Sequence, residues 1–142
     1  MSTFDNVQFI WHGGETTTVG IDFYERAMFL QARYLRSGCA VRNDIQTNGT
    51  LIDKNWASFF ADNGFGVGIS IDGPPELHDR HRRFANGKGS FTSVMNGINQ
   101  LRSFGIKPSV LMVIDKDTLE LGAQKIFDFF LWMYLLRVYE GG

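Results

Sequence analysis

The chain has very little cysteine, because Cys39 is the single cysteine among 142 residues. One cysteine excludes a disulfide within the chain, and it excludes a metal site built from several thiolates of this chain. Cys39 follows an expected helix and precedes an expected strand, where a small buried apolar side chain is the ordinary role. We therefore assign no metal ligand and no redox chemistry to it.

The sequence also lacks an excess of charge, with 14 basic and 15 acidic residues and a formal net charge of −1. Binding to nucleic acid or to an anionic lipid surface through overall charge needs a basic surplus, so neither partner is expected. Long apolar runs are missing too: residues 125–136 include a lysine and an aspartate and are too short to span a bilayer. The N-terminus has no secretion-signal pattern. We expect a cytoplasmic protein with no membrane partner.

What the sequence does have is an alternation of strand-like and helix-like segments without hairpin signals. The expected strands, short and rich in β-branched or aromatic residues, are 7–11, 40–47, 65–71 and 107–114. The expected helices that follow them are 22–37, 52–64, 90–105 and 118–134. Strand followed by helix, repeated in this way, predicts parallel strands with right-handed crossovers and hence an α/β sheet covered by helices.

Local signals support two of these helices and set one region apart. In the first helix, apolar side chains recur at helical spacing at Phe23, Ala27, Leu30 and Tyr34. Asp53 is a good N-cap for the second helix, and Gly64 is a good stop. The polar stretch 72–89 is expected to be irregular, and it is longer than a crossover loop needs, so we interpret it as functional.

Ligands of parallel α/β folds collect at the carboxyl ends of the strands. The segments at these ends read HGGE (12–15), QTNGT (46–50), SIDGPP (70–75) and IDKDT (114–118). The first three combine glycine with polar side chains, so backbone can approach a ligand closely while donors and acceptors are held in place. We expect a small polar or charged ligand that spans several strand ends.

Simpler interpretations of the same residues remain open at this point. Gly13 and Gly14 can form a tight turn, with Glu15 placing its charge at the following helix N-terminus. Residues 47–50 and 72–74 both have ordinary turn composition. His78 and His81 are more typical of a solvated face than of a metal site, so no metal is expected. The glycines of 64–68 do not fit a dinucleotide fingerprint, because they do not lie between strand and helix.

The order of the motifs carries more than any one of them. WHGGE, IQTNGTLID, VGISIDGPPELHDRHR, GKGSF and GIKPSVLMVID, in that order, resemble the core of the radical S-adenosylmethionine (SAM) enzymes. The resemblance extends to about Phe130 and is strongest to the anaerobic sulfatase-maturating, SPASM-type peptide-maturase branch. It implies a partial (β/α) barrel of about four strand-helix units over residues 1–142. It also implies radical hydrogen abstraction from the side chain of a peptide or protein, such as a sulfatase or a ribosomally made precursor peptide.

The resemblance also implies which residues bind the S-adenosylmethionine cofactor. In the family, the glycine-glycine-glutamate stretch binds the methionyl amino group, which assigns backbone acceptors to Gly13 and Gly14 and the pairing carboxylate to Glu15. Ser70 matches a position that contacts the ribose or carboxylate, and Arg82 matches a basic residue that reaches the same cofactor and suits a carboxylate. The family stretch near cofactor and substrate is matched by Gln46, Thr47 and Asn48.

The sequence departs from the family pattern in ways that bear on the expected function. Thr16, Thr17 and Thr18 stand where proline usually follows the glutamate. The three-cysteine loop that ligates a [4Fe-4S] cluster is absent, so we expect the cluster-bearing strand upstream of Met1 and a further strand missing at residues 131–142. No catalytic residue is assigned. The chain is therefore expected to be part of a radical maturase, prone to self-association through open sheet edges. The alternative is a non-catalytic α/β domain that binds a nucleotide-like ligand or a protein partner.

Overall fold

The contacts of the chain group it into two compact units in the computed structural model, which describes residues 5–35 and 37–135. The first unit contains the residues up to Ser70 together with Ser93–Val110. The second contains Ile71–Thr92 and the residues from Leu111 onward. Within the described ranges, no helix is long and apolar enough to cross a membrane.

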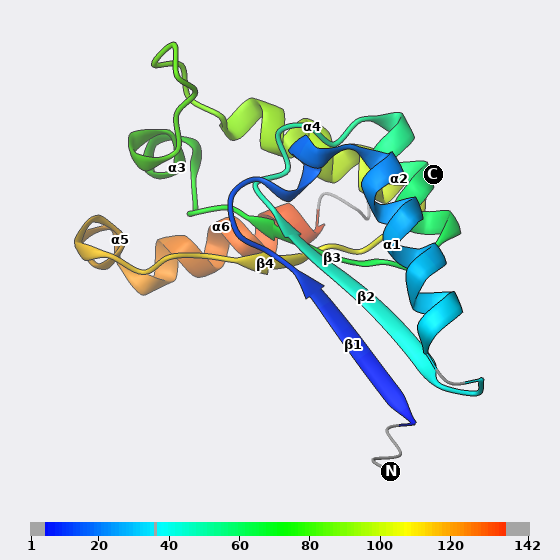
Figure 1. The fold of residues 1–142 in the computed structure, drawn as a ribbon. Helices are drawn as coiled ribbons and strands as arrows, with labels where there is room; N and C mark the ends of the chain where they lie inside the picture. Colours follow the sequence, from blue (N-terminus) through cyan, green and yellow to red (C-terminus); the bar gives the residue numbers. More distant parts are fainter. Residues whose placement is uncertain (1–4, 36, 136–142) are drawn as a thin grey trace. The chain divides into compact units, whose positions relative to one another are not determined.

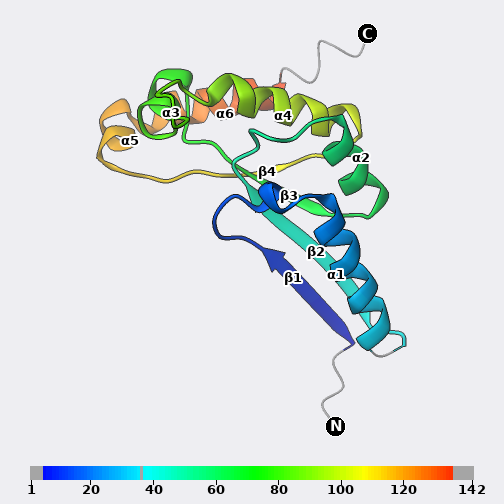
Figure 2. The ribbon, with the colours of Figure 1, turned by 45° about the horizontal axis from the view of Figure 1, so that its top comes forward.

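The first unit is a parallel sheet with helices between its strands. Its elements are β1 (Asn6–Trp11), the 3₁₀ turn η1 (Thr16–Val19), α1 (Ile21–Tyr34), β2 (Ala40–Thr47), α2 (Lys54–Asp62), β3 (Gly66–Ser70), and most of α4 (Phe91–Ser103) and β4 (Ser109–Leu111). The strand order is β1-β2-β3-β4, and β2 runs parallel to both β1 and β3. Figures 1 and 2 show α1 running alongside β1 and β2. The predicted α/β class with four strand-helix units is confirmed.

An aromatic cluster forms the core of the first unit between α1, α2 and β3. Its members, buried and with neighbouring ring centroids 5.2–6.4 Å apart, are Tyr24, Trp56, Phe59, Phe60 and Phe65. Edge-on and tilted ring pairs of this kind add about 0.5–1.5 kcal/mol each beyond burial of their area. The Asp53 side chain accepts a hydrogen bond from the Trp56 N–H, so the predicted N-cap of α2 is confirmed.

The buried face of α1 is not its most apolar one. Phe23, Leu30 and Tyr34 are exposed by 47%, 42% and 73%, whereas Tyr24 and Gln31 are buried. Gln31 exchanges two hydrogen bonds of 2.9 Å with Asn43 on β2, which satisfies both amides inside the unit. Helical periodicity therefore predicted the helix, but polar pairing selects the face that the sheet covers.

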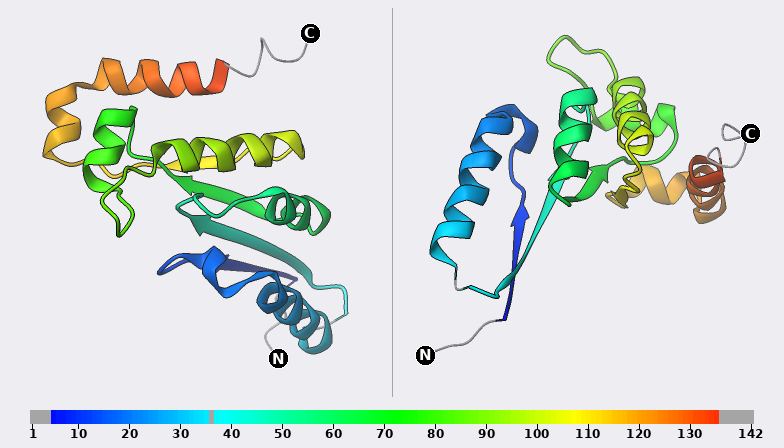
Figure 3. Two further views of the ribbon diagram at one scale, coloured as in Figure 1. Left: turned by 90° about the horizontal axis from the view of Figure 1, so that it is seen from above. Right: turned by 90° about the vertical axis from the view of Figure 1, so that its right-hand side faces the viewer.

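The second unit contains short helices in places where the sequence predicted other structure. Its helices are α3 (Pro75–His81), α5 (Lys116–Leu121), α6 (Ala123–Leu135) and the start of α4, drawn in Figure 3. The irregular stretch expected at 72–89 includes α3, which a proline in its first turn favours. The single helix expected at 118–134 is two helices, because Gly122 has φ +89° and separates them.

Two smaller expectations also need correction. The strand expected at 107–114 is reduced to Ser109–Leu111. Cys39 is only partly buried, because it follows the exposed residues Ser37 and Gly38 on the surface of the unit. Of the expected departure at 131–142, residues 131–135 belong to the end of α6, and residues 136–142 lie outside the described part.

Candidate functional site

The Glu15 carboxylate joins the ends of β1 and β2 in the first unit. Its Oε1 atom accepts hydrogen bonds from the Thr17 backbone N–H (3.1 Å), the Thr17 hydroxyl (2.6 Å) and the Thr47 hydroxyl. Its Oε2 atom accepts one from the Asn48 N–H (2.8 Å). Figure 1 shows the loop after β1 meeting the end of β2. Glu15 is thus the N-cap of η1, as the simpler interpretation has it, and also a bridge between two strand ends.

The charge of Glu15 is not compensated by this bridging. The donors that reach it are backbone N–H groups and hydroxyls, all neutral, and no ion pair to Glu15 is formed among the described residues. Among the described residues, Oε1 accepts from Thr17 and Thr47, whereas Oε2 accepts from the Asn48 N–H alone. A carboxylate oxygen can accept more than one hydrogen bond, so Oε2 is the atom that can take a cationic donor such as an ammonium.

The backbone next to Glu15 is open. Gly13 and Gly14 have φ +94° and +56°, conformations that residues with a Cβ rarely adopt. Apart from the adjacent residues, no atom of the described chain lies within 4 Å of the position that a Cβ would take at either glycine. A ligand can therefore approach the carbonyl groups of this turn closely, which fits the acceptor role that the resemblance implies.

A buried tyrosine of α1 holds the turn after β1 in place. The Tyr24 hydroxyl donates to the Thr16 carbonyl (2.8 Å), and burial raises the pKa of Tyr24, so this hydroxyl keeps its proton. The Thr16 hydroxyl in turn donates to the Gln46 carbonyl (3.0 Å) on β2. The threonines that replace the usual proline therefore hold the turn in place by hydrogen bonds.

The end of β3 connects to the same edge of the sheet through Gln46. The Gln46 side-chain amide donates to the Ser70 hydroxyl (3.0 Å). The Asn48 side chain accepts from both the N–H and the hydroxyl of Thr50, which makes the expected turn. The residues predicted at the ends of β1, β2 and β3 thus lie at the carboxyl ends of adjacent strands. Their role toward a cofactor stays a prediction.

Sequence reasoning missed a groove on the sheet itself. It has a volume of about 360 Å³ and is lined by Gln8, Ile10, Arg42, Asp44, Ile45, Gln46, Gly66, Val67, Gly68, Lys107 and Ser109. A Cβ on Gly66 would lie 1.9 Å from an Asp44 oxygen, and one on Gly68 would lie 2.1 Å from the Gln46 side-chain oxygen. The strand glycines, which the sequence only excluded from a dinucleotide motif, thus make room for these two side chains.

Asp44 is the ionised centre of this groove. Burial opposes its charge, but hydrogen bonds from Gln8 and Arg42 together with the Arg42 charge lower the pKa of Asp44 below its ordinary value. The groove therefore keeps a carboxylate paired with a cation, in contrast to the uncompensated Glu15.

Arg82, the remaining predicted site residue, lies in the second unit. Its Nε and Nη2 atoms donate to the two carboxylate oxygens of Asp72, and Asp72 also accepts from the Val113 N–H (3.0 Å). Gly73 has φ +99°, so the expected turn at 72–74 is present. The Nη1 atom of the guanidinium takes no part in this pairing.

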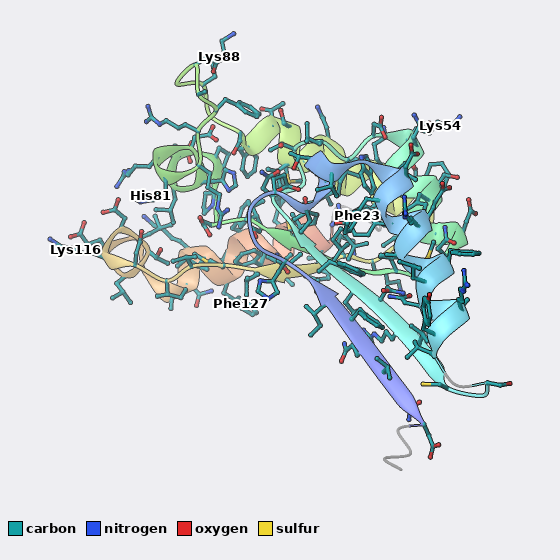
Figure 4. The ribbon with its side chains drawn as sticks, in the orientation of Figure 1. Phe23, Lys54, His81, Lys88, Lys116 and Phe127 are labelled. Carbon is teal, nitrogen blue, oxygen red and sulfur yellow. The ribbon has the colours of Figure 1, made fainter. Side chains whose placement is uncertain are left out.

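The two histidines of the HDRH stretch have different partners. His78 is fully buried and bonds to the Asp72 N–H and the Ser90 hydroxyl. His81 lies on the side of α3 that faces α5 (Figure 4). Its Nε2 atom lies 3.2 Å from Asp115 Oδ2 and 3.1 Å from Asp117 Oδ2. No group of three or more potential metal ligands occurs in the part of the chain that the structure describes.

The fold and site together define a class: a parallel α/β protein that presents glycine backbone, a carboxylate and polar side chains at the ends of adjacent strands. The sequence profile of the Radical SAM superfamily matches residues 2–121. The chain belongs to this superfamily, so the resemblance stated from its motifs is confirmed.

The most informative relatives are anaerobic sulfatase-maturating enzymes. The serine-type enzyme of Bacteroides thetaiotaomicron is 47% identical over 113 residues, which are 80% of this chain and 27% of the relative. The cysteine-type enzyme of Clostridium novyi is 43% identical over 125 residues, 88% of this chain and 33% of the relative. The chain therefore spans about a third or less of the length of these relatives.

Solved structures of this kind share the fold. Native anSMEcpe with bound AdoMet aligns with a TM-score of 0.87 and 32% identity over 92% of this chain and 36% of that chain. The same protein with bound AdoMet and Cp18Cys peptide gives a TM-score of 0.86 and 32% identity over 91% of this chain and 36% of that chain. The radical SAM type of fold is confirmed, and the comparisons support this interpretation over a non-catalytic domain.

Proposed function

We propose that the chain binds S-adenosylmethionine at the ends of β1, β2 and β3 and belongs to an enzyme that matures a peptide or protein, in the manner of sulfatase maturation. The observation that carries the proposal is the Glu15 carboxylate, fixed by neutral donors and flanked by two open glycines. An uncompensated carboxylate beside exposed carbonyl groups suits the ammonium of a methionyl group. A charge-assisted contact of this type contributes roughly 1.5–3 kcal/mol.

Each predicted site residue has its own proposed role toward this cofactor. Glu15 Oε2 and the carbonyls of Gly13 and Gly14 would hold the ammonium, and Asn48 would keep Oε2 in position. Ser70 and Arg82 would bind the cofactor's carboxylate or ribose. When bound, S-adenosylmethionine supplies, after one-electron cleavage of a carbon–sulfur bond, the chemistry of hydrogen abstraction from a substrate side chain. These residues bind and orient; none of them is assigned as an acid or base.

The residues of the chain do not fit a [4Fe-4S] cluster. Such a cluster is held by several thiolates, and the chain has Cys39 alone. No step is therefore assigned to iron on this chain. We expect anaerobic iron–sulfur reconstitution of the purified chain to give no stoichiometric cluster, as read by iron and sulfide content; a stable cluster with full occupancy would contradict this assignment.

The proposed substrate class is a peptide or protein side chain. The relatives include both serine-type and cysteine-type maturating enzymes, and a solved neighbour holds a peptide together with AdoMet. Association of copies through the β1 edge of the sheet belongs to the same proposal, because Ile10 on this strand is 61% exposed.

Calorimetric titration tests the binding proposal. S-adenosylmethionine and adenosine are titrated separately into the chain, since adenosine lacks the ammonium and carboxylate that the proposed site recognises. We expect S-adenosylmethionine to bind at least tenfold more tightly. Equal affinities would show that the chain recognises neither the ammonium nor the carboxylate of the methionyl group, and would overturn the proposal.

A further inference from the structure

A chain of hydrogen bonds through the buried His78 connects the backbones of Asp72 and Arg82. The Asp72 N–H donates to His78 Nδ1 (3.2 Å), His78 Nε2 lies 2.9 Å from the Ser90 hydroxyl oxygen, and the Ser90 hydroxyl donates to the Arg82 carbonyl (2.9 Å). All four residues belong to the second unit. The chain therefore begins and ends on the two residues whose side chains form the ion pair.

The geometry fixes the protonation state of His78. A backbone N–H can only donate, so the Nδ1 atom that receives the Asp72 N–H must carry a lone pair. Because Ser90 uses its proton on the Arg82 carbonyl, its oxygen is free to accept from His78 Nε2–H. Each group is then satisfied once, and the ring is neutral with its proton on Nε2. Burial and the nearby Arg82 charge lower the pKa of His78, which agrees with this state.

These hydrogen bonds also fix the orientation of the Arg82 guanidinium. The Arg82 N–H also donates to the His78 carbonyl (2.9 Å), so the backbone of Arg82 is held from two directions. Asp72 is held through its own N–H, and its carboxylate receives two guanidinium nitrogens. With both backbones fixed, the ion pair has a fixed direction, and so does the Nη1 atom that takes no part in it.

We propose that His78, as the neutral Nε2–H tautomer, is the positioning residue that aims Arg82 at the carboxylate of the cofactor. The part of this inference that concerns the cofactor rests on the proposed function. In this proposal His78 itself does not contact the ligand and acts through Ser90 and Asp72. The phenyl ring of Phe91 packs edge-on against the imidazole, with the two ring centroids 5.7 Å apart.

The first test reads the tautomer directly. Long-range ¹H–¹⁵N spectra of the full chain separate an imidazole nitrogen that carries a proton from one that does not. We expect an unprotonated Nδ1 and a protonated Nε2 for His78 at neutral pH. The opposite tautomer, or a ring protonated on both nitrogens, would overturn the proposal.

The second test breaks the chain of hydrogen bonds at Ser90. Ser90→Ala removes the acceptor of Nε2–H and the donor to the Arg82 carbonyl, and Ser93→Ala, a partly exposed serine in α4, is the matched control. We expect hydrogen exchange at the Arg82 Nε–H to become several-fold faster in S90A and to stay unchanged in S93A. Affinity for S-adenosylmethionine should fall about threefold to tenfold in S90A, with adenosine affinity unchanged. Unchanged exchange at Arg82 in a folded S90A would overturn the proposal.

Arg82→Gln separates the two proposals. If R82Q binds S-adenosylmethionine as tightly as the parent chain while the tautomer and exchange results are as expected, the cofactor role of Arg82 is wrong and His78 still positions it. If R82Q weakens binding but the tautomer is the opposite one, the role of Arg82 stands and the positioning by His78 is wrong.

Discussion

Glu15 in the first unit and Asp72 in the second unit are both carboxylates at strand ends, but they are held by different kinds of donor. Neutral N–H and hydroxyl groups hold Glu15, whereas a guanidinium holds Asp72. A carboxylate fixed by neutral donors keeps a full charge that a cationic ligand can use. The charge of a carboxylate paired with arginine is neutralised by the guanidinium, and the pairing orients that arginine. This difference is the reason why we propose Glu15, and not Asp72, as the carboxylate that binds the ligand.

Glu15→Gln is expected to have the largest effect on binding. The amide keeps the shape and one acceptor oxygen, but it removes the charge that an ammonium would meet, so affinity for S-adenosylmethionine should fall about 10- to 100-fold. Calorimetry on the chain measures the change, with the exposed Glu25→Gln on α1 as the control. Unchanged affinity in E15Q would show that Glu15 does not bind the ligand.

Asp72→Asn should show the reverse pattern. The substitution leaves the partly buried Arg82 without its counter-charge, so the free energy of unfolding should fall by about 1–3 kcal/mol. S-adenosylmethionine affinity should change less than in E15Q, because Asp72 is not proposed to touch the ligand. Urea unfolding measures the stability, and Glu76→Gln, an exposed acid of α3, is the matched control. A D72N protein as stable as the parent would contradict the structural role.

The sequence predicted the place of Glu15 but not the way it is held. Parallel strands bring their carboxyl ends to one edge, so Glu15 and Asn48 were expected to be neighbours. The rotamers that aim the Thr17 and Thr47 hydroxyls at Oε1 depend on tertiary contacts, and no local pattern encodes them. Helix α3 was missed for a related reason, because a short helix of mostly polar residues has no apolar periodicity to detect. The cap at Asp53, a purely local interaction, was predicted correctly.

Thr47→Val removes one of the neutral donors that hold Glu15. Valine keeps the shape of threonine but loses the hydroxyl that donates to Glu15 and accepts from the Gly49 N–H (3.0 Å). We expect about threefold to tenfold weaker binding of S-adenosylmethionine, because Glu15 retains its other donors. Thr47→Ser restores the hydroxyl and should restore most of the affinity in the same titration. If serine and valine behave alike, the hydroxyl does not hold the carboxylate.

The pH dependence of stability should differ between His78 in the second unit and Asp44 in the first. We expect this effect to be the smallest of those predicted here. The pKa of His78 is lowered by burial and by Arg82, so between this lowered value and the ordinary 6.5 the unfolded chain binds more protons than the folded one. Stability from this group is therefore lost as the pH falls below 6.5. The pKa of Asp44 is lowered too, so its contribution is present above 3.8 and is lost only as the pH falls through its folded pKa.

Hydrogen exchange followed by NMR between about pH 7.5 and about pH 5.5 can separate these windows, because neutral histidine titrates there and aspartate does not. We expect amides around His78 to lose protection in this range while those of β2 around Asp44 keep theirs. In His78→Gln, whose amide does not titrate, the loss near residue 78 should be reduced, and Gln31→Ala in the first unit should leave it in place. Equal losses around both groups would mean that protons act on the chain as a whole and not through His78, and would contradict this prediction.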